Sequence, residues 1–174
     1  MDIHRFEKGW LVASLALIVL FISTVAYVSA VTGVDMVDDS GGSIDVDNVT
    51  EDDRFSDPRV EQVGENEYDV YMVAQQFVFR PGSEPFGPVR VPENSTVNFY
   101  ITSQDVVHGF QIVGTNVNVM VVPGKVSEIT VEFDEPAEYG ILCNEYCGSG
   151  HAEMGGNVEV VARDEWNTTD GGGS

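Results

Sequence analysis

A long apolar run near the N-terminus is the clearest hydrophobic pattern in the chain. Residues 10–31 contain no charged side chain, and about 20 consecutive apolar residues are what a helix needs to cross a bilayer. The pattern predicts one transmembrane helix over residues 10–31. Arg5 and Lys8 precede it. Because positive residues favour the cytoplasmic side, we expect residues 1–9 in the cytoplasm and the rest of the chain outside the cell membrane.

A cleaved signal peptide is the alternative interpretation of this segment. Val28, Ser29 and Ala30 form a small-residue motif of the kind at which signal peptides are cut. The apolar core of a signal peptide spans about 7–15 residues, whereas this run is long enough to fill a bilayer. The length therefore favours a retained, single-pass anchor in the lipid bilayer. Both interpretations place the C-terminal part on the extracytoplasmic side.

Beyond residue 66 the apolar positions fall into short segments rich in Val, Ile, Tyr and Phe, separated by turn signals such as Pro81-Gly82 and Pro123-Gly124. This spacing is typical of an antiparallel sandwich and not of alternating helices and strands. We predict a mainly β, Greek-key β-sandwich over residues 67–163. The segments expected to be strands are Tyr68–Ala74, Phe77–Arg80, Val89–Val91, Thr96–Thr102, Gly109–Val113, Val117–Val121, Ser127–Phe133, Tyr139–Leu142 and Asn157–Val161.

The residues between these two parts, 32–66, are rich in Asp, Glu, Gly and Ser and follow neither a helical nor a sustained strand period. We expect an acidic, solvated linker. Asp45 and Asp47 lie close together, but the segment lacks the spaced ligands and closing Glu of an EF-hand, which argues against a calcium site. Residues 164–174 end in a Gly-rich run and are expected to form a C-terminal tail.

The overall charge narrows the classes of partner. With 29 acidic and 8 basic side chains, the formal net charge is −21, and such a chain repels the phosphates of nucleic acid. Nucleic-acid binding is therefore excluded. An acidic excess of this size also repels itself in dilute buffer, whereas molar salt shortens the screening length to about 3 Å. We interpret the charge as a sign of a halophilic source, with a disordered acidic tail as the alternative.

The candidate chemistry lies between Cys143 and Met154, where two thiols, an imidazole and a thioether occur within twelve residues. Thiolate and thioether ligands prefer copper, and imidazole accepts it as well, so the set indicates a redox copper site. A disulfide between Cys143 and Cys147 would suit an exported protein but leaves His151 and Met154 without a role. A structural zinc site is the third interpretation, although such sites rarely use Met.

The number of cysteines bears on the number of metal ions. A blue-copper site uses one Cys, whereas here Cys143 and Cys147 are four residues apart. A loop that folds back can present both sulfurs to one point, so that each bridges two copper ions and the centre works as a one-electron relay. A second imidazole is then needed. His108 follows the strand expected at Thr96–Thr102, in a loop at one end of the sandwich.

These two segments resemble the copper A domain of cytochrome c oxidase subunit II, which carries Cys-x-Glu-x-Cys-x3-His-x2-Met preceded by Ser-x-Asp-Val-x-His. The resemblance covers residues 67–162 and the membrane anchor, and it implies a cupredoxin fold with a dinuclear copper A centre. It also implies the ligands: Cys143 and Cys147 on both coppers, His108 and Met154 on one, and His151 with the backbone carbonyl of Glu145 on the other.

The resemblance further implies the partners: a haem-bearing subunit I and an extracytoplasmic donor, either a cytochrome c or a small blue-copper protein. In longer relatives the carboxylate at Glu145 helps to bind magnesium. The single span is similar to the short subunit II of ba3-type oxidases. The family's Trp-rich docking segment is absent here, which leaves Phe77 and Phe79 as candidates for that role.

Two rival functions stay open at this point. A copper A subunit of a nitric oxide reductase would carry the same ligands and differ in its catalytic partner. A membrane-anchored copper carrier or assembly protein would bind copper without relaying electrons. The complete ligand set, which leaves no open position on the metal, argues against the carrier.

Overall fold

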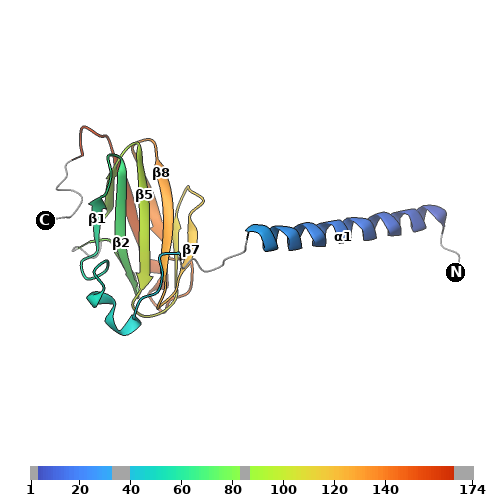
Figure 1. Ribbon diagram of the computed structural model, residues 1–174, viewed down its shortest axis with the longest axis horizontal. Coiled ribbons are helices and arrows are strands. Elements are labelled where there is room, and N and C mark those ends of the chain that lie inside the picture. The colour runs from blue at the N-terminus through green and yellow to red at the C-terminus, as the bar shows by residue number, and fades with distance from the viewer. Residues whose placement is uncertain (1–3, 33–39, 83–86, 167–174) are drawn as a thin grey trace. The chain divides into compact units, whose positions relative to one another are not determined.

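The computed structural model describes residues 4–32, 40–82 and 87–166, which belong to two separate units (Figure 1). The first unit contains α1 (Arg5–Thr32), a single helix. Its stretch from Arg5 to Tyr27 is long and apolar enough to cross a membrane. The side chains of residues 4–27 are all exposed within the chain, as expected for a helix that is apolar all round and needs lipid to cover it.

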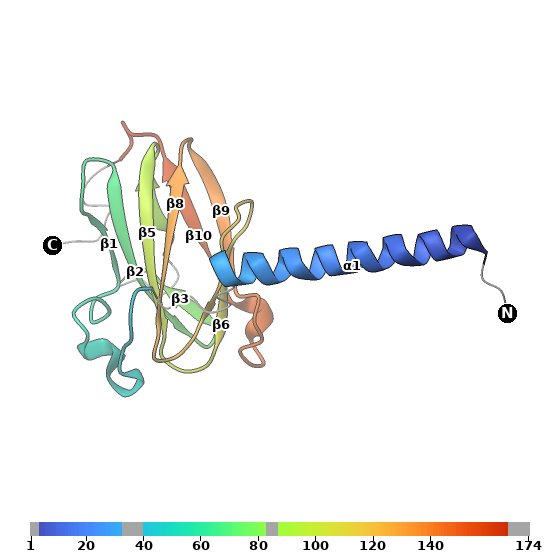
Figure 2. The same cartoon turned by 45° about the vertical axis from the view of Figure 1, so that its right-hand side comes forward.

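The second unit is a sandwich of two five-stranded sheets (Figure 2). One sheet has the order β1-β2-β5-β8 with β3 also beside β2, and the other has the order β4-β10-β9-β6-β7. The predicted mainly β sandwich with one N-terminal apolar helix is thus confirmed. The strands are β1 (Arg59–Gln62), β2 (Glu67–Gln75), β3 (Val78–Arg80), β4 (Val89–Pro92), β5 (Ser95–Ser103), β6 (His108–Ile112), β7 (Asn118–Val121), β8 (Val126–Phe133), β9 (Ala137–Leu142) and β10 (Gly155–Val161).

Strand direction differs from the expected antiparallel arrangement. The pairs β2–β5 and β4–β10 are parallel, whereas the other strand pairs in the described residues are antiparallel. The chain leaves the first sheet after β3 and forms β4 in the second sheet before it returns as β5. A parallel β2–β5 pair needs such a crossover, since a tight hairpin can join only antiparallel neighbours.

The core fills the space between the two sheets. Along β5, Val97, Phe99 and Ile101 are fully buried and alternate with half-buried residues, as the two-residue period of a strand requires. Phe99 on β5 meets Phe110 on β6 with ring centroids 5.7 Å apart, and Phe110 meets Phe79 on β3 edge-on at 5.6 Å. These rings join the inner faces of the two sheets.

The expectation of a solvated linker does not hold for residues 40–66. This segment forms a 3₁₀ helix (Val46–Glu51) and strand β1. Val49 and Phe55 are each 1% exposed and pack against β2 and the start of β8. Isolated apolar residues in a polar segment give no periodic signal, so only their tertiary contacts reveal them. Residues 33–39, also expected as linker, lie outside the described residues.

The packing of Phe55 predicts that this segment stabilises the sandwich. Phe55→Ala should lower the free energy of unfolding by about 3 kcal/mol, because it leaves a cavity beside β2. Val63→Ala is the matched control, since Val63 is 49% exposed, and it should change stability by less than about 0.5 kcal/mol. Urea unfolding followed by tryptophan fluorescence measures both. Equal stability of the two variants would mean that the segment is a passive linker.

Candidate metal centre

Two connections at one end of the sandwich, β5–β6 and β9–β10, carry the predicted ligands. His108 is the first residue of β6, and its pairing with Val121 on β7 fixes its backbone. Cys143 directly follows β9, and Met154 directly precedes β10. The base of the loop between them is closed by the β9–β10 ladder and by a hydrogen bond from the Cys143 amide to the Met154 carbonyl at 3.2 Å.

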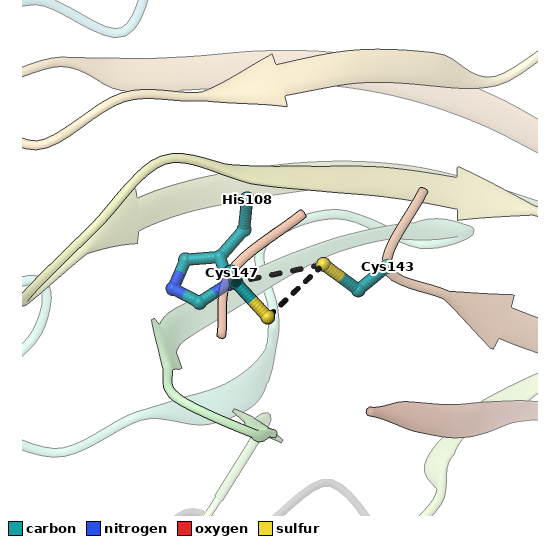
Figure 3. A group of neighbouring side chains, drawn as sticks. All are labelled: His108, Cys143 and Cys147. Carbon is teal, nitrogen blue, oxygen red and sulfur yellow. Dashed lines mark hydrogen bonds between the residues drawn. The ribbon is translucent and has the colours of Figure 1, made fainter. Parts of the chain in front are cut away.

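The side chains of His108, Cys143 and Cys147 point toward one another (Figure 3). The two Sγ atoms are 3.9 Å apart, and His108 Nδ1 lies 3.8 Å from Cys143 Sγ. All three residues are buried, and His108 is fully so. Both cysteines are free thiols in this structure. A disulfide is therefore not needed to hold the loop in this conformation.

The remaining predicted ligands lie against the same two sulfurs. His151 Nδ1 is 3.6 Å from Cys147 Sγ, and Met154 Sδ is also 3.6 Å from it. The Cys143 thiol donates to the backbone carbonyl of Glu145 at 3.2 Å. The Glu145 side chain itself is exposed. The structure thus brings together all six residues named from the sequence, with Glu145 contributing its backbone.

Asp105 fixes the orientation of the His108 ring. Its Oδ1 lies 2.8 Å from His108 Nε2, so with the proton on Nε2 the ring presents Nδ1 to the sulfurs. Burial raises the pKa of the Asp105 carboxyl, but hydrogen bonds from the Gln76 amide, the His108 ring and the Val106 amide outweigh it, and the pKa lies below its usual value. An ionised carboxylate behind an imidazole is the usual support for a metal-binding His.

The Cys147 thiol is in an environment that favours its protonated form when no cation is bound. Burial, followed by the neighbouring Cys143, raises the pKa of the Cys147 thiol to about 11. A thiolate is the form that binds metal, so a cation must displace the proton as it binds. Sulfur, imidazole and thioether donors in a buried site fit copper and do not fit calcium or magnesium. The residues present therefore suit a copper centre.

The turn between β2 and β3 lies against the cysteine loop. Gln76 Nε2 donates to the Cys147 carbonyl at 2.5 Å, a contact that sequence reasoning missed. Phe77 adopts a φ of 147°, a conformation that costs a non-glycine residue on the order of 1–3 kcal/mol. Its ring packs against Gly148 and Gly150. The two glycines were the only sequence signal that another part of the chain approaches closely here.

The two aromatic candidates for a docking surface differ in accessibility. Phe79 is 2% exposed and packs in the core against Phe110, so it cannot touch another protein. Phe77 is partly exposed and lies at the rim of the cysteine loop. Strand alternation alone would put positions 77 and 79 on the same face. Phe77 differs because it lies in the turn before β3 (Val78–Arg80), with a φ of 147°.

Comparison with known proteins gives close relatives over most of the chain. A family model described as the periplasmic domain of cytochrome c oxidase subunit II matches residues 55–161. A cytochrome c oxidase subunit 2 of Thermus thermophilus is 40% identical over 163 residues, covering 91% of this chain and 93% of the relative. A second such protein from Thermus thermophilus is 43% identical over 119 residues, covering 67% of this chain and 84% of the relative.

Solved structures agree with these relatives. A chain of a haem-copper terminal oxidase dimer, solved by cryo-electron microscopy, superposes with a TM-score of 0.64 at 30% identity and covers 90% of this chain and 99% of its own. The periplasmic domain of subunit II of the cytochrome oxidase of Bradyrhizobium japonicum shares the fold, with a TM-score of 0.50, 18% identity and coverage of 60% and 89%. The chain therefore belongs to the cytochrome c oxidase subunit II family, as the cupredoxin-like, membrane-anchored subunit of an oxidoreductase, a haem-copper oxidase.

Proposed function

We propose that this chain is the electron-accepting copper A subunit of a haem-copper terminal oxidase. It accepts single electrons from an extracytoplasmic cytochrome c or small blue-copper protein and passes them to haem in subunit I, where oxygen is reduced to water. The observation that carries the proposal is the convergence of two thiols, two imidazoles, one thioether and one carbonyl at one end of the sandwich.

The arrangement of the terminal ligands supports a dinuclear site. One copper is assigned to His108 and Met154, and the other to His151 and the Glu145 carbonyl. In each pair, one ligand lies against Cys143 and the other against Cys147. Each pair of terminal ligands thus reaches both cysteines, which is what a dinuclear site held by Cys143 and Cys147 together would need. When bound, the copper pair supplies a one-electron redox centre.

The burial of these ligands suits an electron relay better than it suits a copper carrier. The residues of the chain exclude water from the thiols, hold the His108 ring through Asp105 and leave His151 half-exposed at the loop surface. A carrier needs an open ligand position through which to release its metal. The six-donor set leaves none. Oxygen is favoured over nitric oxide as the terminal acceptor because the Thermus relatives are cytochrome c oxidase subunits.

The proposal includes the surroundings of the site. The exposed carboxylate of Glu145 is free to bind magnesium at the contact with subunit I. The partly exposed Phe77 is the candidate contact for the donor. Helix α1 anchors the chain with its N-terminus in the cytoplasm, in keeping with the short ba3-like subtype. The halophilic source inferred from the net charge stays a prediction.

Copper content and electron paramagnetic resonance test the proposed centre. The full chain, purified in detergent and loaded with copper, should bind two copper ions that share one unpaired electron. The spectrum should show hyperfine splitting from two equivalent copper nuclei, because the electron is spread over both. One copper per chain with the spectrum of a blue site would contradict the proposal.

The bridging role of the cysteines predicts the effect of removing one of them. Cys143→Ser should abolish the shared-electron spectrum and leave at most one copper per chain, since a hydroxyl is a poor bridge for soft metal ions. Ser149→Ala is the matched control, because Ser149 is an exposed residue of the same loop. It should retain both coppers. A shared-electron spectrum in the Cys143→Ser protein would show that the ligand assignment is wrong.

Labelling of cysteines introduced into a Cys143→Ser/Cys147→Ser chain, on intact cells, tests the orientation of the anchor. Ser56→Cys places a thiol on the exposed surface of the sandwich unit, and Glu7→Cys places one at the start of α1. A membrane-impermeant thiol reagent should label the first variant and spare the second until the cells are broken. Labelling of Glu7→Cys on intact cells would place the N-terminus outside.

A further inference from the structure

The β2–β3 turn makes two contacts with the loop that carries Cys147. The side-chain amide of Gln76 donates to the Cys147 carbonyl at 2.5 Å, and the Phe77 ring covers Gly148 and Gly150. A Cβ atom at Gly150 would lie 2.7 Å from the Phe77 ring, and one at Gly148 would lie 2.9 Å from Gln76 Nε2. Gly148 also has a φ of 135°. Only glycine allows the turn and the loop to approach this closely.

The same turn is bonded to the loop that carries His108. Asp105 Oδ2 accepts the backbone N–H of Gln76 at 2.7 Å, while its Oδ1 contacts His108 Nε2 at 2.8 Å. Gln76 therefore donates from its backbone to one ligand-bearing loop and from its side chain to the other. The partners lie 29 and 71 residues away in the sequence. One residue of the β2–β3 turn thus links the two ligand-bearing loops by two hydrogen bonds.

The strained backbone of the β2–β3 turn indicates that its contacts with the two loops determine its conformation. The hairpin between β2 and β3 closes through Gln76 and Phe77, with Gln75 opposite Val78. Two-residue hairpin loops favour Gly or Asn where φ is positive, yet Phe77 has a φ of 147°. A strained residue persists where the surrounding contacts hold it in place. Contacts with both loops thus hold the turn in this conformation.

We propose that Gln76 is a positioning residue that clamps the two ligand-bearing loops of the metal centre together. The inference rests on the proposed copper A centre and deepens it. Gln76 bonds to the Asp105 carboxylate and to the Cys147 backbone carbonyl, and not to an atom assigned as a copper ligand. It keeps the distance between His108 and Cys147 fixed while the charge of the centre changes by one electron. A site whose ligands move little between oxidation states exchanges electrons with a smaller reorganisation, so the clamp serves the relay directly.

Variants at Gln76 test the clamp in the full chain, purified in detergent and loaded with copper. Gln76→Met keeps the length of the side chain and removes the donor, so copper should be lost to a chelator about 3- to 10-fold faster, as expected for one hydrogen bond. Gln76→Glu presents only acceptors to the Cys147 carbonyl and should lose copper faster still. Both variants should change the copper hyperfine splitting, which a purely structural role would leave unchanged.

Gln75→Met is the matched control. Gln75 is the neighbouring residue of the same type, and its side chain contacts Arg80 at 3.5 Å. This variant should release copper at the wild-type rate. Gln76→Arg keeps a donor at the end of the side chain and covers the case in which Gln76→Met fails to fold. Wild-type release by Gln76→Arg supports the clamp, and release as fast as that of Gln76→Glu overturns it.

The remaining outcomes separate the clamp from the proposed function. Wild-type spectra and release rates in both Gln76→Met and Gln76→Glu would overturn the clamp and leave the copper centre intact. A higher KM for the electron donor, with release and spectrum unchanged, would assign Gln76 to donor docking and also overturn the clamp. A wild-type chain that binds no copper pair would overturn the proposed function together with the clamp.

Discussion

The two buried thiols of Cys143 and Cys147 cannot share their site as thiolates unless a cation compensates their charge, and the rest of the site is arranged around this constraint. Their sulfurs are 3.9 Å apart in an environment that raises the pKa of Cys147 to about 11. Two negative sulfurs at this distance would repel each other strongly in a buried site. Protons or soft metal ions can remove the repulsion. Only metal ions also use the neighbouring imidazoles and thioether.

The sandwich provides this arrangement with fixed supports. The β9–β10 ladder closes the base of the cysteine loop, pairing Leu142 with Gly155, and the β6–β7 ladder fixes the backbone at His108. The loop itself is rich in glycine and has little regular structure beyond a short 3₁₀ turn at His151–Glu153. Its conformation therefore depends on contacts from outside the loop. Gln76 and Phe77 supply them, and Asp105 in turn accepts the backbone N–H of Gln76.

Much of the fold and the ligand set could be predicted from the sequence, because both leave local patterns. Alternating apolar residues located all nine strands that were expected, and the spacing of Cys143, Cys147, His151 and Met154 signalled a soft-metal site. Contacts between distant segments leave no such pattern. The packing of Phe55 under β2 was missed for this reason, as was the hydrogen bond from an exposed Gln76 to a backbone carbonyl 71 residues away.

The direction of β5 explains why the β2–β3 turn lies beside the loop that carries His108. Because β2 and β5 are parallel, with Ala74 opposite Ser103, their carboxyl ends lie at the same end of the sheet, and the Gln104 amide donates to the Ala74 carbonyl just beyond it. Gln76 and Asp105 follow these two ends directly. An antiparallel pair would have placed them at opposite ends of the sandwich. The crossover through β4, which sequence periodicity could not predict, is thus what brings the β2–β3 turn to the metal centre.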